Sequence, residues 1–212
     1  MRLFSYKLTH DKGFAPNPFW GALTLATCKP GFRRSKRIGD WIAGFTSEKL
    51  CGDQVGEERL IFLVRVERKI SIEDYYHDRR FKRKIPTIAA KEEINRVGDN
   101  IYRPLCPCPM TASDFVLVPN SNHTEKNKVR DISGKNVLLG TNFVYFGRNA
   151  LSIPPNLRPN VPQGQSAQGT RTHDAERARK FIEFVMRNAS ACRIHAPPHS
   201  WPEGDESWSV TR

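Results

Sequence analysis

The sequence contains no hydrophobic run long enough to cross a bilayer. Its longest apolar stretches, such as residues 60–64, are far shorter than the roughly 20 residues of a membrane-spanning helix. The N-terminal segment reaches Lys7 too soon for the apolar stretch of a signal peptide. Cysteines are few, and the five present are irregularly spaced, as in proteins of a reducing compartment. We therefore expect a cytoplasmic protein that has no membrane partner.

The motifs of several large enzyme classes are also missing from the sequence. It has no Walker loop, no glycine-rich dinucleotide loop, no His-Glu-x-x-His zinc motif and no Gly-x-Ser-x-Gly nucleophile elbow. Cys106 and Cys108 alternate with prolines and could help to bind zinc, with His123 or Cys51 as distant partners. A rigid surface loop with two ordinary thiols explains the pattern better, because zinc sites usually present recognisable ligand pairs. We expect no metal and no cofactor.

A histidine with a carboxylate next to it follows two tyrosines, Tyr75 and Tyr76. His77 precedes Asp78, and an oriented His–Asp pair is a common part of acid–base sites. No candidate nucleophile is near in the sequence, so the catalytic residues, if there are any, stay unknown at this point.

Acidic residues are scarce relative to basic ones. The chain has 34 Lys and Arg against 22 Asp and Glu, a net charge of +12, which favours a polyanion as partner. Because the basic residues cluster between aromatics, we expect a nucleic acid, or a nucleotide, rather than an effect on solubility alone. The residues expected to contact phosphates are Arg33, Arg34, Lys36, Arg37, Arg79, Arg80, Lys82, Arg83 and Arg148.

The alternating apolar pattern predicts a small mixed or all-β barrel of five or six strands. Residues 59–69 alternate most clearly, and residues 119–136 are interpreted as a polar loop. Ser71 and Asp74 have the spacing of a capping box and predict the start of a short helix. The expected strands are 3–8, 22–26, 41–45, 59–69, 115–118 and 137–146, and the expected helices are 33–37, 72–77 and 173–188.

Composition divides the chain into four parts. Residues 1–150 are expected to form the folded domain, and residues 151–172 form a linker or arm rich in Pro and Gln. Residues 173–190 hold an amphipathic helix that would dock on the domain. Residues 191–212 are expected to form a flexible tail.

Several separate motifs pair a polar group with an aromatic side chain or a tight turn. A base pocket needs that mixture, because flat faces stack on the base and a few donors and acceptors bind its edge. Trp41 could stack on a base or equally fill the core. The residues expected to converge on one cleft are Asn17, Phe19, Asp40, Trp41, Ser47, Asp99, Asn100 and Tyr102.

These motifs together resemble those of one family, the nucleotide modification associated domain, type two. The resemblance implies a role in systems that modify bases in phage and bacterial DNA. A looser likeness, from Gly39-Asp40-Trp41, Ser47 and the strand at 143–147, is to the EVE, YTH and ASCH branch of PUA-like barrels. That likeness implies an α+β fold: a small twisted β-barrel with short peripheral helices and a C-terminal helix. The residues that carry the family resemblance are 1–6, 13–19, 22–30, 33–35, 39–41 and 98–102.

Two functions stay open on this basis. The first is a module that recognises a modified or flipped base, in DNA more than in RNA, within a modification or defence system. The second is an enzyme that acts on a nucleotide or base with Asp40, Asp99, Asn100 or His77 in its cleft. A structural subunit of a phage or defence complex, associated with DNA-modification proteins, is a weaker third hypothesis.

Overall fold

The structure is a computed structural model that describes residues 1–164, 169–189 and 193–211. Outside the described residues lie residues 165–168 of the predicted linker, residue 190 of the predicted docking-helix segment, and residues 191–192 and 212 of the predicted tail. The strands are β1 (Leu3–Lys7), β2 (Leu23–Leu25), β3 (Trp41–Phe45), β4 (Leu60–Arg65), β5 (Arg68–Ser71), β6 (Tyr102–Pro104), β7 (Phe115–Leu117), β8 (Asn136–Gly140), β9 (Phe143–Tyr145) and β10 (Thr170–Thr172). The α-helices are α1 (Pro30–Ser35), α2 (Glu48–Cys51), α3 (Ile72–His77), α4 (Glu93–Arg96), α5 (Glu125–Ile132) and α6 (Ala175–Asn188). The 3-10 helices are η1 (Arg79–Lys84), η2 (Ala112–Asp114), η3 (Gly147–Asn149), η4 (Pro155–Leu157) and η5 (Ser207–Thr211).

The described strands form three sheets rather than one closed barrel. A five-stranded sheet has the order β10-β1-β3-β4-β9, a three-stranded sheet the order β2-β8-β5, and β6 pairs with β7. Strands β1 and β3 are parallel, and the other neighbours in the sheets are antiparallel. The α+β class is therefore confirmed, whereas the predicted closed barrel is not formed by the described part of the chain.

The barrel prediction fails where two predicted strands break and change sheets. The predicted strand 59–69 is β4 in the first sheet and β5 in the second, and the predicted strand 137–146 divides in the same way into β8 and β9. The crossing is close: a Cβ on Gly140 would lie 2.0 Å from the carbonyl oxygen of Arg65. Glycine thus allows β8 to pass the end of β4, an approach that alternation in the sequence does not reveal.

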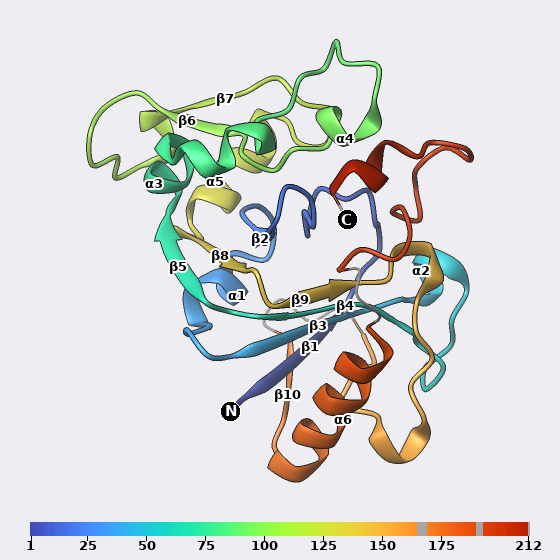
Figure 1. The fold of residues 1–212 in the computed structure, drawn as a ribbon. Coiled ribbons are helices and arrows are strands. Elements are labelled where there is room, and N and C mark those ends of the chain that lie inside the picture. The colour runs from blue at the N-terminus through green and yellow to red at the C-terminus, as the bar shows by residue number, and fades with distance from the viewer. Residues whose placement is uncertain (165–168, 190–192, 212) are drawn as a thin grey trace.

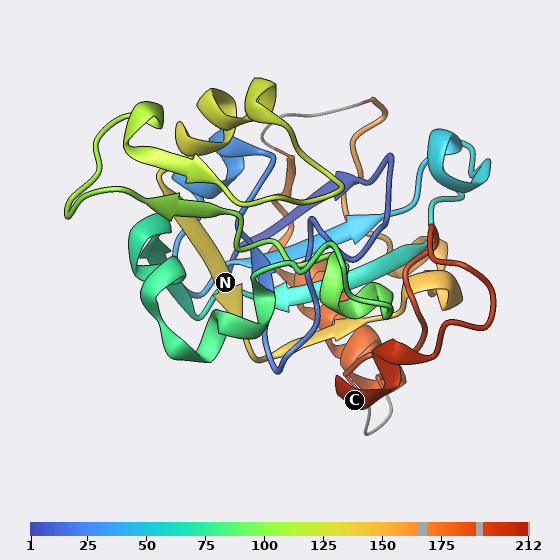
Figure 2. The same ribbon diagram turned by 90° about the horizontal axis from the view of Figure 1, so that it is seen from above.

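The five-stranded sheet is covered on both faces. One face packs on α6 through a cluster that includes Trp41, Phe45, Leu63 and Phe181. Figure 1 shows α6 beneath this sheet, with β6, β7, α3 and α5 at the other end of the molecule. In the view from above, α2 lies at the side opposite to α3 (Figure 2). The predicted helix at 173–188 is confirmed, with its first turn capped by Asp174.

Local signals at the N-terminus mark three further helices, α3, α1 and α5. The α3 helix spans the predicted residues, and the Ser71 side chain accepts a hydrogen bond from the Asp74 amide, as expected. The α1 helix begins three residues earlier than predicted, at Pro30, where proline fits the first helical position. The prediction of a loop over 119–136 is wrong, because this segment contains α5, whose N-terminus has a capping box at Thr124 and Asn127.

The C-terminal segment 193–211 packs against the loop that follows β1. Trp201 lies 5.3 Å from Phe19 between ring centroids, and its indole nitrogen donates to the Lys12 carbonyl at 2.9 Å. Asp11 is buried and accepts hydrogen bonds from Tyr145 and from the backbone amide of His199. These contacts hold the loop at residues 9–15 in place. Among the described residues, no helix has the length and apolar character needed to span a membrane.

Candidate active site

A cavity of about 200 Å³ lies between three segments that are far apart in the sequence. Its walls come from β1 and the following loop (residues 6–15), from β2 and the turn into α1 (residues 25–33), and from residues 122–123 before α5. Apolar and aromatic side chains form most of the walls, among them Tyr6, Phe14 and Phe32. A largely apolar cavity with few polar groups is the usual form of a small-molecule site.

Cys28 lies in this cavity, on the turn between β2 and α1. Its φ angle is +54° and that of Lys29 is +39°, a left-handed conformation that non-glycine residues seldom adopt. Such conformations cost ~1–3 kcal/mol each and cluster at functional sites, where surrounding contacts maintain them. Here the Cys28 amide donates to Asp131 and the Cys28 carbonyl accepts from the Arg33 guanidinium, both at 2.9 Å.

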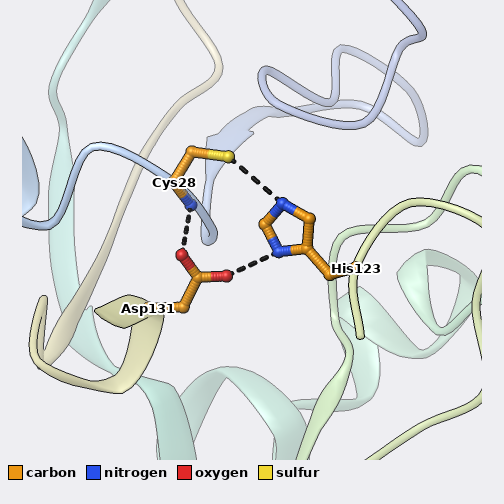
Figure 3. A group of neighbouring side chains, drawn as sticks. All are labelled: Cys28, His123 and Asp131. Atoms are coloured by element: carbon orange, nitrogen blue, oxygen red, sulfur yellow. Dashed lines mark hydrogen bonds and ion pairs between the residues drawn. The ribbon is translucent and has the colours of Figure 1, made fainter. Parts of the chain in front are cut away.

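Cys28, His123 and Asp131 form a chain of contacts. The Cys28 Sγ atom lies 3.4 Å from His123 Nε2, and His123 Nδ1 lies 2.6 Å from Asp131 Oδ2. Figure 3 shows the imidazole ring between the sulfur and the carboxylate, with Asp131 also bonded to the Cys28 amide. The order thiol, imidazole, carboxylate is that of a nucleophile, its base and the group that orients the base.

The segment before α5 folds so as to present His123. The Asn120 side chain accepts hydrogen bonds from the amides of Asn122 and His123, which forms a tight turn. Helix α5 begins directly afterwards, and Asp131 follows eight residues after His123, in the last turn of that helix. The Phe14 ring packs edge-on against the imidazole, with 4.9 Å between ring centroids.

The carboxylate of the triad is buried and fully paired. Asp131 has no solvent exposure, and it also accepts a hydrogen bond from the Tyr102 hydroxyl at 2.8 Å. Burial alone would raise the pKa of Asp131, but hydrogen bonds from His123 and Tyr102 and the nearby Arg33 charge lower it overall. We conclude that Asp131 is ionised at neutral pH.

The imidazole of the triad holds its proton more tightly than an ordinary histidine. Burial lowers the pKa of His123, but the hydrogen bonds to Asp131 and Cys28 outweigh it and raise the value to about 9. The ring is therefore an imidazolium at neutral pH, next to the Cys28 sulfur. A cationic imidazole next to a cysteine sulfur is the arrangement found in cysteine–histidine nucleophile pairs.

The same three residues could also be considered as metal ligands. One ligand atom of each lies within 4.8 Å of the others. However, Cys28 and Asp131 contact opposite nitrogens of the imidazole, so an ion bound between Cys28 and Nε2 would leave Asp131 on the far side of the ring. The hydrogen-bond pattern fits a catalytic triad better than a metal centre.

The model of one protein family, nucleotide modification associated domain 2, matches residues 1–205. The chain belongs to this family. No curated protein and no solved structure is similar enough to the chain to match it. The resemblance recognised in the sequence is thereby confirmed at the level of the family, which is named for an association with nucleotide modification.

In this nucleotide modification associated domain, the eight residues predicted to form a base pocket lie in several places. Asn17, Asp99 and Asn100 are buried close together, where Asn17 accepts a hydrogen bond from Lys84 and Asp99 accepts one from Tyr75. The Asn100 side chain donates to the Tyr75 carbonyl. This group is a closed hydrogen-bond network in the protein interior.

Of the other five predicted pocket residues, only Phe19 is joined to that network, through a hydrogen bond from its backbone amide to the Asn17 side chain at 3.3 Å. Asp40 forms a bidentate ion pair with Arg2, and Ser47 caps α2. Trp41 packs in the core between the five-stranded sheet and α6. Phe19 packs on Trp201. Tyr102 alone of these five contacts the triad, through Asp131. Among the described residues, none of the eight lines the 200 Å³ cavity, and their binding of a base stays a prediction.

The predicted phosphate contacts also divide between surface and interior. Arg33 is buried, and its guanidinium donates to the carbonyls of Cys28, Asp131 and Asn136. Lys36 is buried against the Phe4 ring. Arg148 is half-buried and donates to a backbone carbonyl. Those exposed to solvent are Arg34, Arg37, Arg79, Arg80, Lys82 and Arg83.

Sequence reasoning missed the triad itself. Cys28 was noted only within a family motif, and His123 only as a distant zinc ligand. The available signal is local: a cysteine two residues after a predicted strand and just before Lys29-Pro30, a position where a strand-to-helix turn can expose a nucleophile. Nothing in the sequence joins that turn to His123, which is 95 residues away.

Proposed function

We propose that this domain is a thiol-dependent enzyme that transfers or hydrolyses an acyl group on a nucleotide or nucleobase. Cys28 acts as the nucleophile, His123 as the acid–base group and Asp131 as the residue that orients the ring. The observation that carries the proposal is the position of the imidazole, 3.4 Å from the Cys28 sulfur and 2.6 Å from the Asp131 carboxylate, beside a cavity. The nucleotide as substrate is suggested by the family name.

The proposed reaction has two steps. In the first, the Cys28 thiolate attacks an acyl carbon, the bond from that carbon to its leaving group breaks, and His123 gives its Nε2 proton to the leaving group. In the second, the neutral imidazole takes a proton from water or from an acceptor hydroxyl, whose oxygen attacks the thioester. The thiolate and the imidazolium are then restored, so atoms and charge balance over the cycle.

A recognition module is the second candidate. The exposed arginines and the aromatic walls of the cavity favour a domain that binds a modified or flipped base in DNA, on a PUA-like scaffold, without chemistry. The two candidates differ in one property: an enzyme of the proposed kind needs a reactive Cys28, whereas a reader does not.

Alkylation with iodoacetamide tests the enzyme proposal. Cys106 and Cys108 are exposed thiols and serve as controls within the same molecule. We expect Cys28, although less exposed, to be alkylated about tenfold faster or more at pH 7, because the His123 ring, 3.4 Å from its sulfur, would activate it as a nucleophile. His123→Gln should slow the alkylation of Cys28 and leave that of Cys106 unchanged, as measured by mass spectrometry of peptides over time. A Cys28 that reacts no faster than Cys106 would refute the proposed chemistry.

Salt-dependent binding tests the proposed interaction with nucleic acid. We expect the wild-type domain to bind single- and double-stranded oligonucleotides, with a logarithmic binding constant that falls linearly with the logarithm of salt concentration. Replacing Arg34 and Arg37 by Gln should reduce that slope by about 0.7–0.9 for each phosphate that the variant no longer neutralises. Arg179→Gln on α6 is the control, because Arg179 is already paired with Glu176 and Glu183. Binding with no salt dependence would contradict this part of the proposal, and parallel DNA and RNA titrations show which polymer is preferred.

A further inference from the structure

Two polar atoms beside the triad are buried without a partner. Within the described part of the chain, neither the Thr27 hydroxyl nor the Asn122 side-chain nitrogen makes a hydrogen bond. Thr27 is 2% exposed and directly precedes Cys28, and Asn122 directly precedes His123. Both residues line the cavity. Since an unsatisfied buried polar group lowers stability, such groups call for an explanation, and a ligand that pairs with them supplies one.

The walls around these two atoms are suited to a flat ring. Tyr6, Phe14 and Phe32 line the same cavity, and Phe14 lies against the His123 ring. Aromatic faces bind planar heterocycles by stacking, and a hydroxyl and an amide nearby can bind the polar edge of the heterocycle. The volume of about 200 Å³ is below the usual range for drug-sized ligands, and it suits a single ring system.

The charge of the cavity is positive. Lys7, Lys12, Lys29 and Arg33 are among its lining residues, and no Asp or Glu is among the lining residues that are described. Lys7 is paired with Glu58 at 2.6 Å, Arg33 is bonded to backbone carbonyls, and the Lys29 ammonium lies over the Tyr6 ring, whereas Lys12 is exposed. Lys12 is therefore the cation best placed to meet an anionic group that extends from the cavity into solvent.

From these three observations, we propose that the cavity binds one nucleotide, with its base between the aromatic walls and its phosphate near Lys12. Thr27 and Asn122 bind the polar edge of the base and determine which base is accepted. The inference rests on the proposed function for the role of Cys28 and names the substrate class of that site. The nucleotide can be a free monophosphate or one unstacked from a strand, since both present the same base and phosphate.

Calorimetric titration of the full chain with the Cys28→Ala substitution tests this inference, because that variant binds without reacting. The probes are the four deoxynucleoside 5′-monophosphates and the matching nucleosides. We expect at least one monophosphate to bind about tenfold more tightly than its nucleoside at low salt, through the charge of Lys12. Adding Lys12→Gln should remove that difference and leave the affinity for the nucleoside unchanged.

Thr27→Val tests the contact with the base. We expect it to weaken both the monophosphate and the nucleoside about five- to tenfold, because it removes one hydrogen bond at constant volume. Without ligand, the same variant should melt at the same temperature as its parent or higher, since an unpaired buried hydroxyl has been replaced by a methyl group. Thr141→Val is the control, because the Thr141 hydroxyl bonds to Glu67 on the surface, in the turn between β8 and β9, and it should leave the affinity unchanged.

The outcomes separate this inference from the enzyme proposal. If neither a monophosphate nor a single-stranded oligonucleotide of mixed sequence binds, or if Thr27→Val leaves every affinity unchanged, the inference is wrong. If only the oligonucleotide binds, with the same loss in Thr27→Val, the ligand is a nucleotide within a strand. The reactivity of Cys28 towards iodoacetamide does not depend on any nucleotide. If a monophosphate binds but Cys28 is unreactive, the enzyme proposal is refuted and the nucleotide site stands. If Cys28 is reactive but no nucleotide binds, the nucleotide site is refuted and the enzyme proposal stands.

Discussion

We expect Lys84→Met to lower the free energy of unfolding by about 3–5 kcal/mol, as a broken buried charge network does. Lys84 has no solvent exposure, and its ammonium donates to the Asn17 side chain at 2.6 Å, to the Ala22 carbonyl at 2.9 Å and to the Thr24 hydroxyl at 3.1 Å. Methionine fills a similar volume but leaves these acceptors and the buried Asp99 without the cation. Equilibrium unfolding in urea measures the change.

The matched control for this substitution is Lys82→Met. Lys82 lies in the same short helix, η1, but is exposed, with its ammonium 5.0 Å from the centre of the Tyr76 ring. Its loss should cost about 1 kcal/mol or less, the size of an exposed cation–π contact. Burial lowers the pKa of Lys84 to about 7, so the comparison belongs at pH 6, where the ammonium is charged. Equal effects of the two substitutions would mean that the network around Lys84 contributes no special stability.

The sequence predicted those elements whose cause is local. The α3 helix begins directly after Ser71 because a serine hydroxyl three residues before Asp74 can cap the first turn, and that signal lies within four consecutive residues. Strand β3 spans the predicted 41–45 because Gly39 and Asp40 mark its start. Whether a longer alternating pattern forms one strand or two depends on contacts with residues far away in the sequence. Residues 59–69 alternate as one strand, but the passage of Gly140 past Arg65 divides them between two sheets.

The triad could not be predicted because its members meet only in the folded chain. The segment that supplies His123 and Asp131 is rich in Lys, Asn and Asp, so its apolar stripe is too weak to distinguish helix α5 from a polar loop. Lys84 is a similar case. It is the last residue of a run of mostly exposed basic residues, and the sequence does not distinguish this buried lysine from its exposed neighbours. Tyr102, selected for an aromatic next to a turn, does contact the triad, but through Asp131 rather than through a base.

We expect the stability of the wild-type domain to depend on pH through His123. The pKa of His123 is about 9 in the folded protein and 6.5 for an ordinary histidine, so the folded state binds the proton more tightly. This contribution is fully present below about pH 6.5 and is lost as the pH rises through about 9. A difference of this size corresponds to ~3 kcal/mol. The measurement is the free energy of unfolding in urea at intervals from pH 6 to pH 10.

The comparison with variants isolates this contribution from the other groups that titrate in the same range. Between pH 6 and pH 10, the free energy of unfolding of His123→Gln should fall by about 2–3 kcal/mol less than that of the wild type, because the variant has no proton to release at this position. Asp131→Asn should flatten the curve in the same way, since the carboxylate is a main cause of the raised pKa. His77→Gln, at an exposed histidine, should keep the wild-type pH dependence. Parallel curves for the wild type and His123→Gln would mean that the ring is neutral at pH 7. In that case Cys28 has no imidazolium beside it, and the thiolate mechanism proposed above loses its physical basis.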